Sequence, residues 1–393
     1  MFSKDASILS TGSPSQERMR SYGDMVEKLH IVVLNQKAKA AGECKNSSEG
    51  RREREIRIGR RLVLYPTNSY SKLSALFDAF TRGRAVLPGK EAPGKKHWLI
   101  TAQDPFETGF VAWLLAARRG IALELQVHTD MESPFFKQES FTNAARAQIA
   151  RFLVPRAQGV RAVSARIACA LKEHANQPPD ILPVFVDAGF FRALPQKTDI
   201  RKKYPQFDFL VLMVSRLSRE KDIQTALEAF RIVTAAHSRA GLIIVGDGPE
   251  REKLEQRTTE HQLRMNVVFA GWQEDLASYY RSADAYLLTS RYEGYGRTLM
   301  EAASLGCPVV SSDVGIVGEV FTHNENALVC PVGDAGCFAQ ALMRIRENEH
   351  LKRALSVRAE QTVNDHAVTK EEYLARSSAL WRAHLRGEKP KVT

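Results

Sequence analysis

The stretch SRYEGYGRTLMEAASLGCPVV, residues 290–310, decides the fold that we expect for this chain. Two glutamates, Glu293 and Glu301, lie around a turn that contains two glycines. The apolar run AYLLTS comes directly before the turn, and the apolar run PVV closes the stretch. A helix predicted over 297–305 would begin with free backbone N–H groups, which form a natural anion site. The stretch therefore predicts a strand, a ligand-binding turn, a helix and a second strand.

Outward from this stretch, the second half of the chain alternates apolar runs with amphipathic segments. Each run is apolar throughout, as expected for strands that are buried on both faces. Strands that alternate with helices indicate a parallel sheet covered by helices on both sides. These strands are predicted over 208–217, 241–246, 267–271, 285–290, 308–313 and 327–333.

The first half of the chain shows the same alternation, so we expect two domains of one type. A length of 393 residues exceeds one ordinary core. The predicted fold class is α/β, with two doubly wound Rossmann-like domains that face a central cleft. The strands of the first half are predicted over 1–5, 30–36, 62–67, 97–103, 122–130 and 181–187, and at the start of 159–174.

One polar segment sets the predicted domain boundaries. Residues 192–206 contain two prolines and show no periodicity, so we place the linker at 194–206. The N-terminal domain then covers 1–193 and the C-terminal domain 207–369. An amphipathic helix over about 370–393 is predicted to pack back on the first domain. Because parallel sheets bind ligands at the carboxyl ends of their strands, we expect functional residues in the post-strand loops of both domains.

Positive charge is concentrated in the first half of the chain. The net charge is +11, with 29 Lys+Arg against 19 Asp+Glu up to Pro195 and 27 against 26 after it. This surplus of positive charge could attract an anionic membrane surface or an anionic acceptor. An ordinary solvated surface would explain it equally well. No nucleic-acid-binding motif accompanies it, so no nucleic-acid partner is expected. The densest basic cluster, RREREIRIGRR at 51–61, is predicted to be an exposed helix or hairpin face.

Hydropathy and cysteine usage narrow the class of protein further. No apolar run approaches the ~18 residues of a membrane-spanning helix, and the N-terminus lacks the apolar core of a signal peptide. We therefore expect a cytoplasmic protein. The five cysteines form no CxxC pair and no metal-ligand spacing, which predicts reduced thiols and no zinc site. They are Cys44, Cys169, Cys307, Cys330 and Cys337.

The loops after the predicted strands of the second half hold charged candidate residues. Arg216 ends one strand and Lys221 lies just before the next helix, so the two cations could hold a pyrophosphate. Solvated loop charges are the alternative for this pair taken alone. Glu301 could hold a ribose diol, while Glu293 could reach a sugar attached to the phosphates. For each glutamate taken separately, the alternative is an acid favoured by the helix dipole.

A glycine turn, GDGPE at 246–250, follows another strand. It allows a backbone to approach a ligand at Gly246, or it makes a tight turn and nothing more. Its G-x-G pattern lacks the third glycine of a dinucleotide-binding fingerprint, which disfavours an NAD site.

Several longer motifs occur in a fixed order around the opening stretch. An E-x7-E pattern appears as EGYGRTLME and is followed by AASLGCPVV. Its companions are VSRLSREKDIQTALEAF, GLIIVGDGPEREKLE, VVFAGW and SADAYLLTSRYEGYG. The ordered set resembles the retaining family-4 glycosyltransferases of the GT-B fold. The resemblance covers about 207–332 closely and extends more weakly through TAQDPFETG, QVHTD, RAVSARIACAL and FVDAGFF in the first half.

The resemblance implies a role for each candidate residue. Arg216 and Lys221 match the family's diphosphate-binding pair. Glu301 matches the ribose-binding acid, and Glu293 matches the acid beside the transferred sugar. His128, in QVHTD, is similar to the family's histidine near the sugar, although taken alone it reads as a packed or surface histidine. The further donor-binding positions are Tyr295, Gly296, Arg297 and Thr298 at sugar and phosphate, Gly271 and Trp272 near the base, Gly246 in the glycine turn, and Gly12 in the first loop.

Two loops depart from the family pattern. The first strand would be short, with Gly12 and Ser13 at the position of the family's Gly-Gly loop. The family's Gly-Gly-x-x-Glu sequence becomes VGIVGE at 314–319, with one glycine displaced.

The resemblance implies transfer of a hexosyl group, with retention, from a nucleoside-diphosphate sugar to an acceptor hydroxyl. The acceptor would be a glycan, a glycolipid or a lipid-linked intermediate, reached from the inner face of a membrane. No metal, and no cofactor besides the donor substrate, is expected, because no Asp-x-Asp sequence occurs. The alternatives are a sugar-nucleotide epimerase of the same fold, a relative of glycogen phosphorylase or synthase, and a non-catalytic nucleotide-sugar-binding module.

Overall fold

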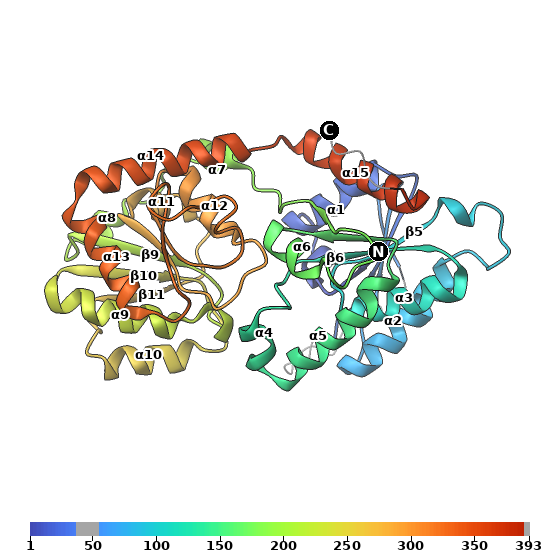
Figure 1. The fold of residues 1–393 in the computed structure, drawn as a ribbon, viewed down its shortest axis with the longest axis horizontal. Coiled ribbons are helices and arrows are strands. Elements are labelled where there is room, and N and C mark those ends of the chain that lie inside the picture. Colours follow the sequence, from blue (N-terminus) through green and yellow to red (C-terminus); the bar gives the residue numbers. More distant parts are fainter. Residues whose placement is uncertain (37–54, 389–393) are drawn as a thin grey trace, which may run out of the picture.

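The computed structural model describes residues 1–36 and 55–388 and consists of two α/β domains side by side (Figure 1). Each domain is built on one sheet, with eight strands in the first domain and six in the second. The predicted fold class, two doubly wound domains, is confirmed.

The sheet of the second domain is entirely parallel, in the order β11-β10-β9-β12-β13-β14. Every strand predicted for this half is present. The strands are β9 (Phe209–Val214), β10 (Ala240–Val245), β11 (Val267–Gly271), β12 (Ala285–Leu288), β13 (Val309–Ser312) and β14 (Leu328–Cys330). The helices are α9 (Ile223–Ala236), α10 (Arg251–Glu260), α11 (Leu276–Ser282), α12 (Arg297–Ser304), α13 (Ala335–Glu347) and α14 (Glu349–His366).

The apolar strands of this domain contribute side chains to two separate hydrophobic clusters, one on each face of the sheet. Leu210 and Leu212 of β9 belong to the cluster that also contains residues of α12. Val211 and Met213 belong to the cluster that contains residues of α9 and α13. Successive side chains of a strand point to opposite faces, so an uninterrupted apolar run buries both faces at once.

The sheet of the first domain has the order β3-β4-β2-β1-β5-β6-β7-β8 and is parallel except for the β3–β4 pair. The predicted first strand is present and short, and it lies between β2 and β5. The strands are β1 (Phe2–Ser3), β2 (Leu29–Val33), β3 (Ile56–Ile58), β4 (Leu62–Pro66), β5 (Leu99–Ala102), β6 (Ala122–Val127), β7 (Gly159–Ala162) and β8 (Asp180–Ile181).

The helices of this half flank the first sheet and lead into the second domain. They are α1 (Pro14–Asp24), α2 (Lys72–Val86), α3 (Glu107–Arg119), α4 (Pro134–Glu139), α5 (Phe141–Leu153), α6 (Ala165–Leu171), α7 (Ala188–Ala193) and α8 (Ile200–Lys203).

The basic cluster at 51–61 is a hairpin over its described part. Strand β3 pairs antiparallel with β4, and Gly59 in the turn has a φ of 63°. The prediction was an exposed helix or hairpin face, and residues 55–61 form the hairpin, while 51–54 lie outside the described residues.

The segment predicted as the linker, 194–206, rests on the second domain. The backbone N–H groups of Lys197 and Thr198 donate to Ser278 Oγ of α11, over 2.9 and 3.1 Å. Asp199 caps α8, and Ile200 is fully buried. Because the segment is polar, its sequence predicted neither the helical turn α8 nor the burial of Ile200.

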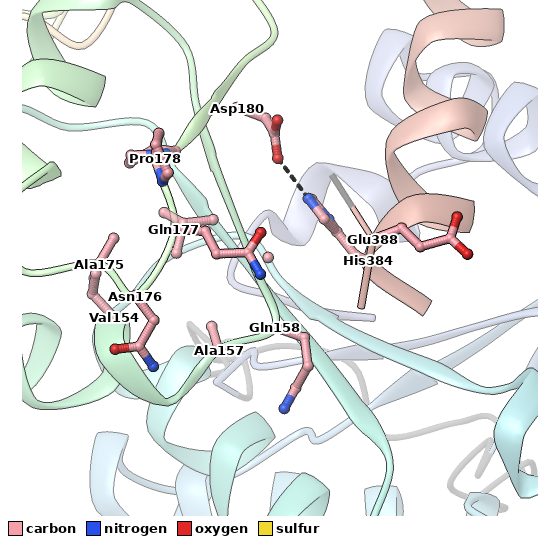
Figure 2. Close-up of a pocket in the computed structure, with 13 residues that line it drawn as sticks. Val154, Ala157, Gln158, Ala175, Asn176, Gln177, Pro178, Asp180, His384 and Glu388 are labelled. Atoms are coloured by element: carbon pink, nitrogen blue, oxygen red, sulfur yellow. Dashed lines mark hydrogen bonds and ion pairs between the residues drawn. The ribbon is translucent and has the colours of Figure 1, made fainter. Parts of the chain in front are cut away.

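The final helix, α15 (Lys370–Arg386), lies on the first domain, whereas α14 lies on the second (Figure 1). His384 contacts Glu124 Oε2 through Nδ1 over 2.8 Å and Asp180 Oδ2 through Nε2 over 2.7 Å. Figure 2 shows the Asp180 contact at the wall of a cavity of about 280 Å³. Burial lowers the pKa of His384, but hydrogen bonds with Asp180 and Glu124 outweigh it and raise that pKa to about 9. A charged imidazolium therefore fastens α15 to the sheet.

The prediction of reduced thiols is wrong for two of the cysteines. Cys330, at the end of β14, and Cys337, in the first turn of α13, form a disulfide with a Cα–Cα distance of 5.7 Å. The turn between strand and helix brings them to the spacing that a disulfide requires. Cys169 and Cys307 are free, and Cys44 lies outside the described residues.

Across the described residues, no helix combines the length and the apolar character needed to cross a membrane.

The His384 contacts predict a pH dependence of stability. The folded pKa of about 9 exceeds the ordinary value of 6.5, so this stabilisation is complete below about pH 6.5 and is lost as pH rises through about 9. Over that range the wild type should lose up to about 3 kcal/mol of unfolding free energy, measured by urea denaturation. His384→Gln should lack this slope, and His350→Gln, an exposed change on α14, should retain it. Equal slopes in the wild type and His384→Gln would contradict the assignment.

Candidate active site

The predicted site residues of the second domain meet where the strand order of its sheet reverses. Strands β9 and β12 are adjacent there, although β10 and β11 lie between them in the sequence. Arg216 follows β9 and Glu293 follows β12, so their loops share the carboxyl edge of the sheet. Ligands of doubly wound sheets bind at such a switch point.

A cavity of about 310 Å³ opens between these loops. Six of the predicted residues line it, together with several side chains that the sequence did not single out. The predicted ones are Arg216, Lys221, Glu293, Gly296, Arg297 and Thr298, and the others include Ser215, Tyr286, Thr289 and Ser290.

An ion pair joins the two loops. Lys221 Nζ lies 2.6 Å from Glu293 Oε1, and both side chains are largely shielded from solvent. Ser290 Oγ donates to the same carboxylate oxygen over 2.7 Å. Lys221 belongs to the one-turn 3₁₀ helix η4 (Arg219–Lys221). The pair holds the Glu293 carboxylate at a fixed place on the cavity wall.

Arg216 lines the cavity and is free to bind an anionic ligand. Its side chain is exposed, and it has no ion-pair partner among the residues that the structure describes. A guanidinium in this position can grip a phosphate with two parallel N–H groups.

The N-terminus of α12 supplies backbone donors to the same cavity. Gly296 is its N-cap, with a φ of 89° that favours glycine. The N–H groups of Gly296, Arg297 and Thr298 find no acceptor within the described part of the chain. Tyr286 donates its hydroxyl to Thr298 Oγ1 over 2.6 Å and thereby fixes that side chain. The arrangement is a helix-terminal anion site.

Glu301 lies one turn deeper in α12 and is not part of the cavity wall. It is 5% exposed, accepts a hydrogen bond from Tyr280 over 3.1 Å and pairs with Arg297 over 2.7 Å. Burial raises the pKa of Glu301, and the Arg297 charge opposes that rise. Half-exposed Arg297 contacts Oε1 of this carboxylate, and Tyr280 contacts Oε2.

His128 comes from the first domain and meets the opening stretch at the interface. It follows β6, and its carbonyl oxygen touches Gly294 so closely that a Cβ there would lie 1.9 Å away. The residue keeps an exposed surface at the interface. Desolvation by the surrounding protein, with help from the charges of Arg161 and Arg18, lowers the pKa of His128. The ring is therefore neutral at pH 7.

The predicted donor-binding positions Gly246, Gly271 and Trp272 lie on the same edge of the sheet, at the ends of β10 and β11. Gly246 N–H donates to the Gly271 carbonyl over 2.8 Å. A Cβ on Gly246 would lie 2.0 Å from the carbonyl oxygen of Ser215, so a side chain cannot be accommodated there. Trp272 is 80% exposed and offers a free aromatic surface.

Gly12 stands apart from this cluster. It lies between β1 and α1 with a φ of 75°, and its N–H donates to Gln16 Oε1 over 3.2 Å. The cavity lined by Arg216 and Glu293 does not include it.

Contacts between the domains involve residues that the sequence did not reveal. Tyr292 donates to Glu139 of α4, and its ring packs edge-on against Phe136 at 5.4 Å. Arg166 Nη2 donates to the Val317 carbonyl over 2.9 Å. Glu319, in the VGIVGE loop, accepts from Ala165 N–H over 2.7 Å, so this loop contacts the first domain despite its displaced glycine.

Ser215 is another residue that the sequence did not single out. Its buried hydroxyl oxygen has no hydrogen-bond partner among the described residues, and the residue lines the cavity. A buried polar atom of this kind is costly unless a ligand or water satisfies it. Its place directly after β9 was the one signal in the sequence.

Gly294→Ala should hold the two domains apart. The new methyl group would lie 1.9 Å from the His128 carbonyl oxygen, so the loops must separate by roughly 1.5 Å to restore van der Waals contact. We expect a larger radius of gyration by small-angle X-ray scattering. Gly89→Ala is the matched control, because nothing lies within 4 Å of a Cβ at that position. A scattering curve unchanged by Gly294→Ala would refute the close approach.

Comparison with known proteins agrees with this geometry. The family described as Glycosyl transferases group 1 matches residues 196–362. N-acetyl-alpha-D-glucosaminyl L-malate synthase of Bacillus anthracis is 29% identical over 219 residues, which are 54% of this chain and 56% of that protein. The lipopolysaccharide core biosynthesis glycosyltransferase LpsD of Rhizobium meliloti is 33% identical over 180 residues, 45% of this chain and 51% of that protein. The matches span about half the length of these relatives.

Solved structures match over nearly the whole chain. Sucrose-phosphate synthase from Thermosynechococcus elongatus has a TM-score of 0.74 at 20% identity, covering 96% of this chain and 94% of that one. HepE from Anabaena in complex with UDP has a TM-score of 0.69 at 17% identity, covering 96% and 97%. At these identities the likeness shows the fold alone. Residues 196–362 thus match the group 1 glycosyltransferase family, and the two α/β domains have the GT-B fold.

Proposed function

We propose that this protein is a retaining glycosyltransferase that moves a hexosyl group from a nucleoside-diphosphate sugar to an acceptor hydroxyl. The observation that carries the proposal is the cavity between β9 and β12, where Arg216, the Lys221–Glu293 pair and the unpaired N–H groups of α12 converge. The relatives are named as glycosyltransferases or glycoside synthases, and HepE was solved with UDP and with UDP and glucose.

In this proposal the cavity binds the diphosphate. Negative charge builds on the leaving diphosphate as the bond to the sugar breaks. Arg216 would hold one phosphate with its planar fork, Lys221 would act as a point charge, and the α12 N–H groups would complete the site. Such donors stabilise the charge without a divalent ion, so we propose that none is required.

Glu293 would orient the transferred sugar. Its carboxylate is held by Ser290 and Lys221, so its remaining lone pairs are directed by the loop rather than by a flexible side chain. Lys221 would then touch the sugar-binding acid and the leaving phosphate at once. Attack by the acceptor hydroxyl on the face that the diphosphate leaves gives retention, with the departing phosphate oxygen taking the acceptor proton.

The first domain would supply the acceptor side and close the site. His128 lies against the loop that contains Glu293, and Tyr292 reaches across to α4. Closure of this kind excludes water, which limits hydrolysis of the donor.

Removing the cations tests the diphosphate site. Arg216→Ala and Lys221→Ala should each lower kcat on the order of 10²-fold or more, because leaving-group charge would lose a partner. Arg219→Ala is the matched control: it removes a cation from the same 3₁₀ turn, where Arg219 is mostly exposed and faces Glu250 at 3.6 Å. UDP-, GDP- and ADP-sugars are first screened by thermal stabilisation, and transfer is then measured with and without chelator. Full turnover in Arg216→Ala, or activity lost on adding chelator, would contradict the proposal.

We further propose that the first domain docks on an anionic membrane surface to reach a lipid-linked acceptor. Helices α2, α3 and α5 form one layer of this domain (Figure 1). These helices and the turn after α5 carry large exposed apolar side chains and exposed basic ones, here together called the aromatic patch. Its apolar members are Leu73, Phe77, Phe110 and Phe152, and its basic members are Lys72, Arg84, Arg118 and Arg156.

The aromatic patch is continuous across α3 and α5. Trp113 lies 5.7 Å from the Phe110 ring and 5.1 Å from the Phe152 ring, measured between centroids. On α2, Leu73 is 80% exposed and Phe77 is 71% exposed, one helical turn apart. Apolar side chains surrounded by cations suit an anionic lipid interface.

The double change Leu73→Ser and Phe77→Ser should weaken vesicle binding about tenfold or more, because two apolar groups would no longer enter the interface. Co-sedimentation with vesicles of anionic phosphatidylglycerol measures this, at low and high salt. Val357→Ser is the control, since Val357 is 63% exposed but lies on α14 of the other domain. Binding that is indifferent to anionic lipid and to the double change would rule out this surface.

A further inference from the structure

Next to His128, the first sheet buries several polar side chains that the proposed mechanism does not use. Glu124 and Gln126 lie on β6, and Arg161 lies opposite on β7. Their exposures are 0%, 2% and 3%. Polar groups are rarely placed so deep in a sheet unless their hydrogen bonds have a purpose.

The orientation of the Gln126 amide is set from both sides. Its Oε1 accepts from Arg161 Nη2 over 2.6 Å, and a guanidinium can only donate. Its Nε2 donates to Glu124 Oε1 over 3.2 Å and to Thr101 Oγ1 over 2.9 Å. A flipped amide would place donor against donor at Arg161 and acceptor against acceptor at Glu124. The oxygen of Gln126 therefore faces Arg161.

The same oxygen faces His128. Its distance to His128 Nε2 is 3.3 Å. Since Gln126 Oε1 can only accept, Nε2 must carry the hydrogen. In a neutral ring Nδ1 then holds the lone pair, and within the described residues Nδ1 has no hydrogen-bond partner. The free nitrogen is a hydrogen-bond acceptor on an exposed residue that adjoins the loop of Gly294.

Desolvation is the main cause of the lowered pKa of His128, and nearby charges modify it. Arg161 and Arg18 oppose an added positive charge, while Glu124 is the carboxylate that favours it. Glu124 is in turn committed to other partners: Trp381 Nε1 at 3.3 Å and the imidazolium of His384 at 2.8 Å, both from α15. The carboxylate of Glu124 is thus shared between Gln126 and the final helix.

We propose that Gln126 is a positioning residue that, held by Arg161 and Glu124, fixes His128 as its Nε2–H tautomer with Nδ1 directed to the ligand as a hydrogen-bond acceptor. This rests on the proposed function, in which the first domain, with His128 against the loop of Glu293, supplies the acceptor side. The ligand group at Nδ1 must then be a hydrogen-bond donor such as a hydroxyl, and neither a phosphate oxygen nor a carboxylate.

The tautomer can be read directly from the full chain. Long-range ¹H–¹⁵N spectra of protein labelled at its 10 histidines distinguish protonated from unprotonated ring nitrogens, and His128→Gln identifies the signal. The wild type should show Nε2–H and a bare Nδ1 near neutral pH. Gln126→Leu should show a mixture of both tautomers. Gln158→Leu is the matched control, a glutamine of the same domain that bonds the Leu123 N–H.

Kinetics supply the second readout. Gln126→Leu should lower kcat about tenfold while the donor KM changes less than about twofold, and thermal denaturation verifies that it is folded. An Nδ1–H tautomer in the wild type, or one unchanged tautomer in Gln126→Leu, would overturn the inference. The spectra need no substrate, so they decide this inference separately from sugar transfer, whose absence in the wild type would defeat the proposed function instead.

Discussion

The ion pair between Lys221 and Glu293 is the interaction on which the site depends. The two residues are 72 positions apart in the sequence, and the reversal of strand order between β9 and β12 makes their loops neighbours. Their 2.6 Å contact fixes the loop that carries Glu293, and the next residue in that loop, Gly294, is the one that meets His128. A single contact thus sets both the wall of the cavity and the approach of the other domain.

The domain interface extends from that point in both directions. Tyr292 packs on α4 on one side, and Arg166 and Glu319 join α6 to the VGIVGE loop on the other. Behind the interface, α15 fastens to the first sheet through His384, and the same Glu124 that receives it also bonds Gln126. The helix that returns from the second domain therefore ends in the polar network behind His128.

The sequence was sufficient where one local pattern determines structure, and insufficient where packing between distant residues does. The strands β9 and β10 were predicted because uninterrupted apolar runs suit a sheet buried on both faces. Helix α2 was not, because it buries the small residues Ala75, Ala79 and Gly83 and exposes Leu73 and Phe77, which inverts the usual amphipathic pattern. The Cys330–Cys337 disulfide and the unpartnered Ser215 hydroxyl depend on turn geometry, which composition does not encode. Motif order located Arg216, Lys221 and Glu293 at one cavity, but it did not show that Glu301 pairs with Arg297 and does not line that cavity.

A crystal structure with a bound nucleoside diphosphate tests the central claim most directly. We expect its β-phosphate in the cavity between β9 and β12, within hydrogen-bond distance of Arg216 and of the α12 N–H groups, with Lys221 bridging the phosphate and Glu293. A diphosphate bound elsewhere on the chain, or one that leaves Arg216 and the α12 terminus without contact, would contradict the account.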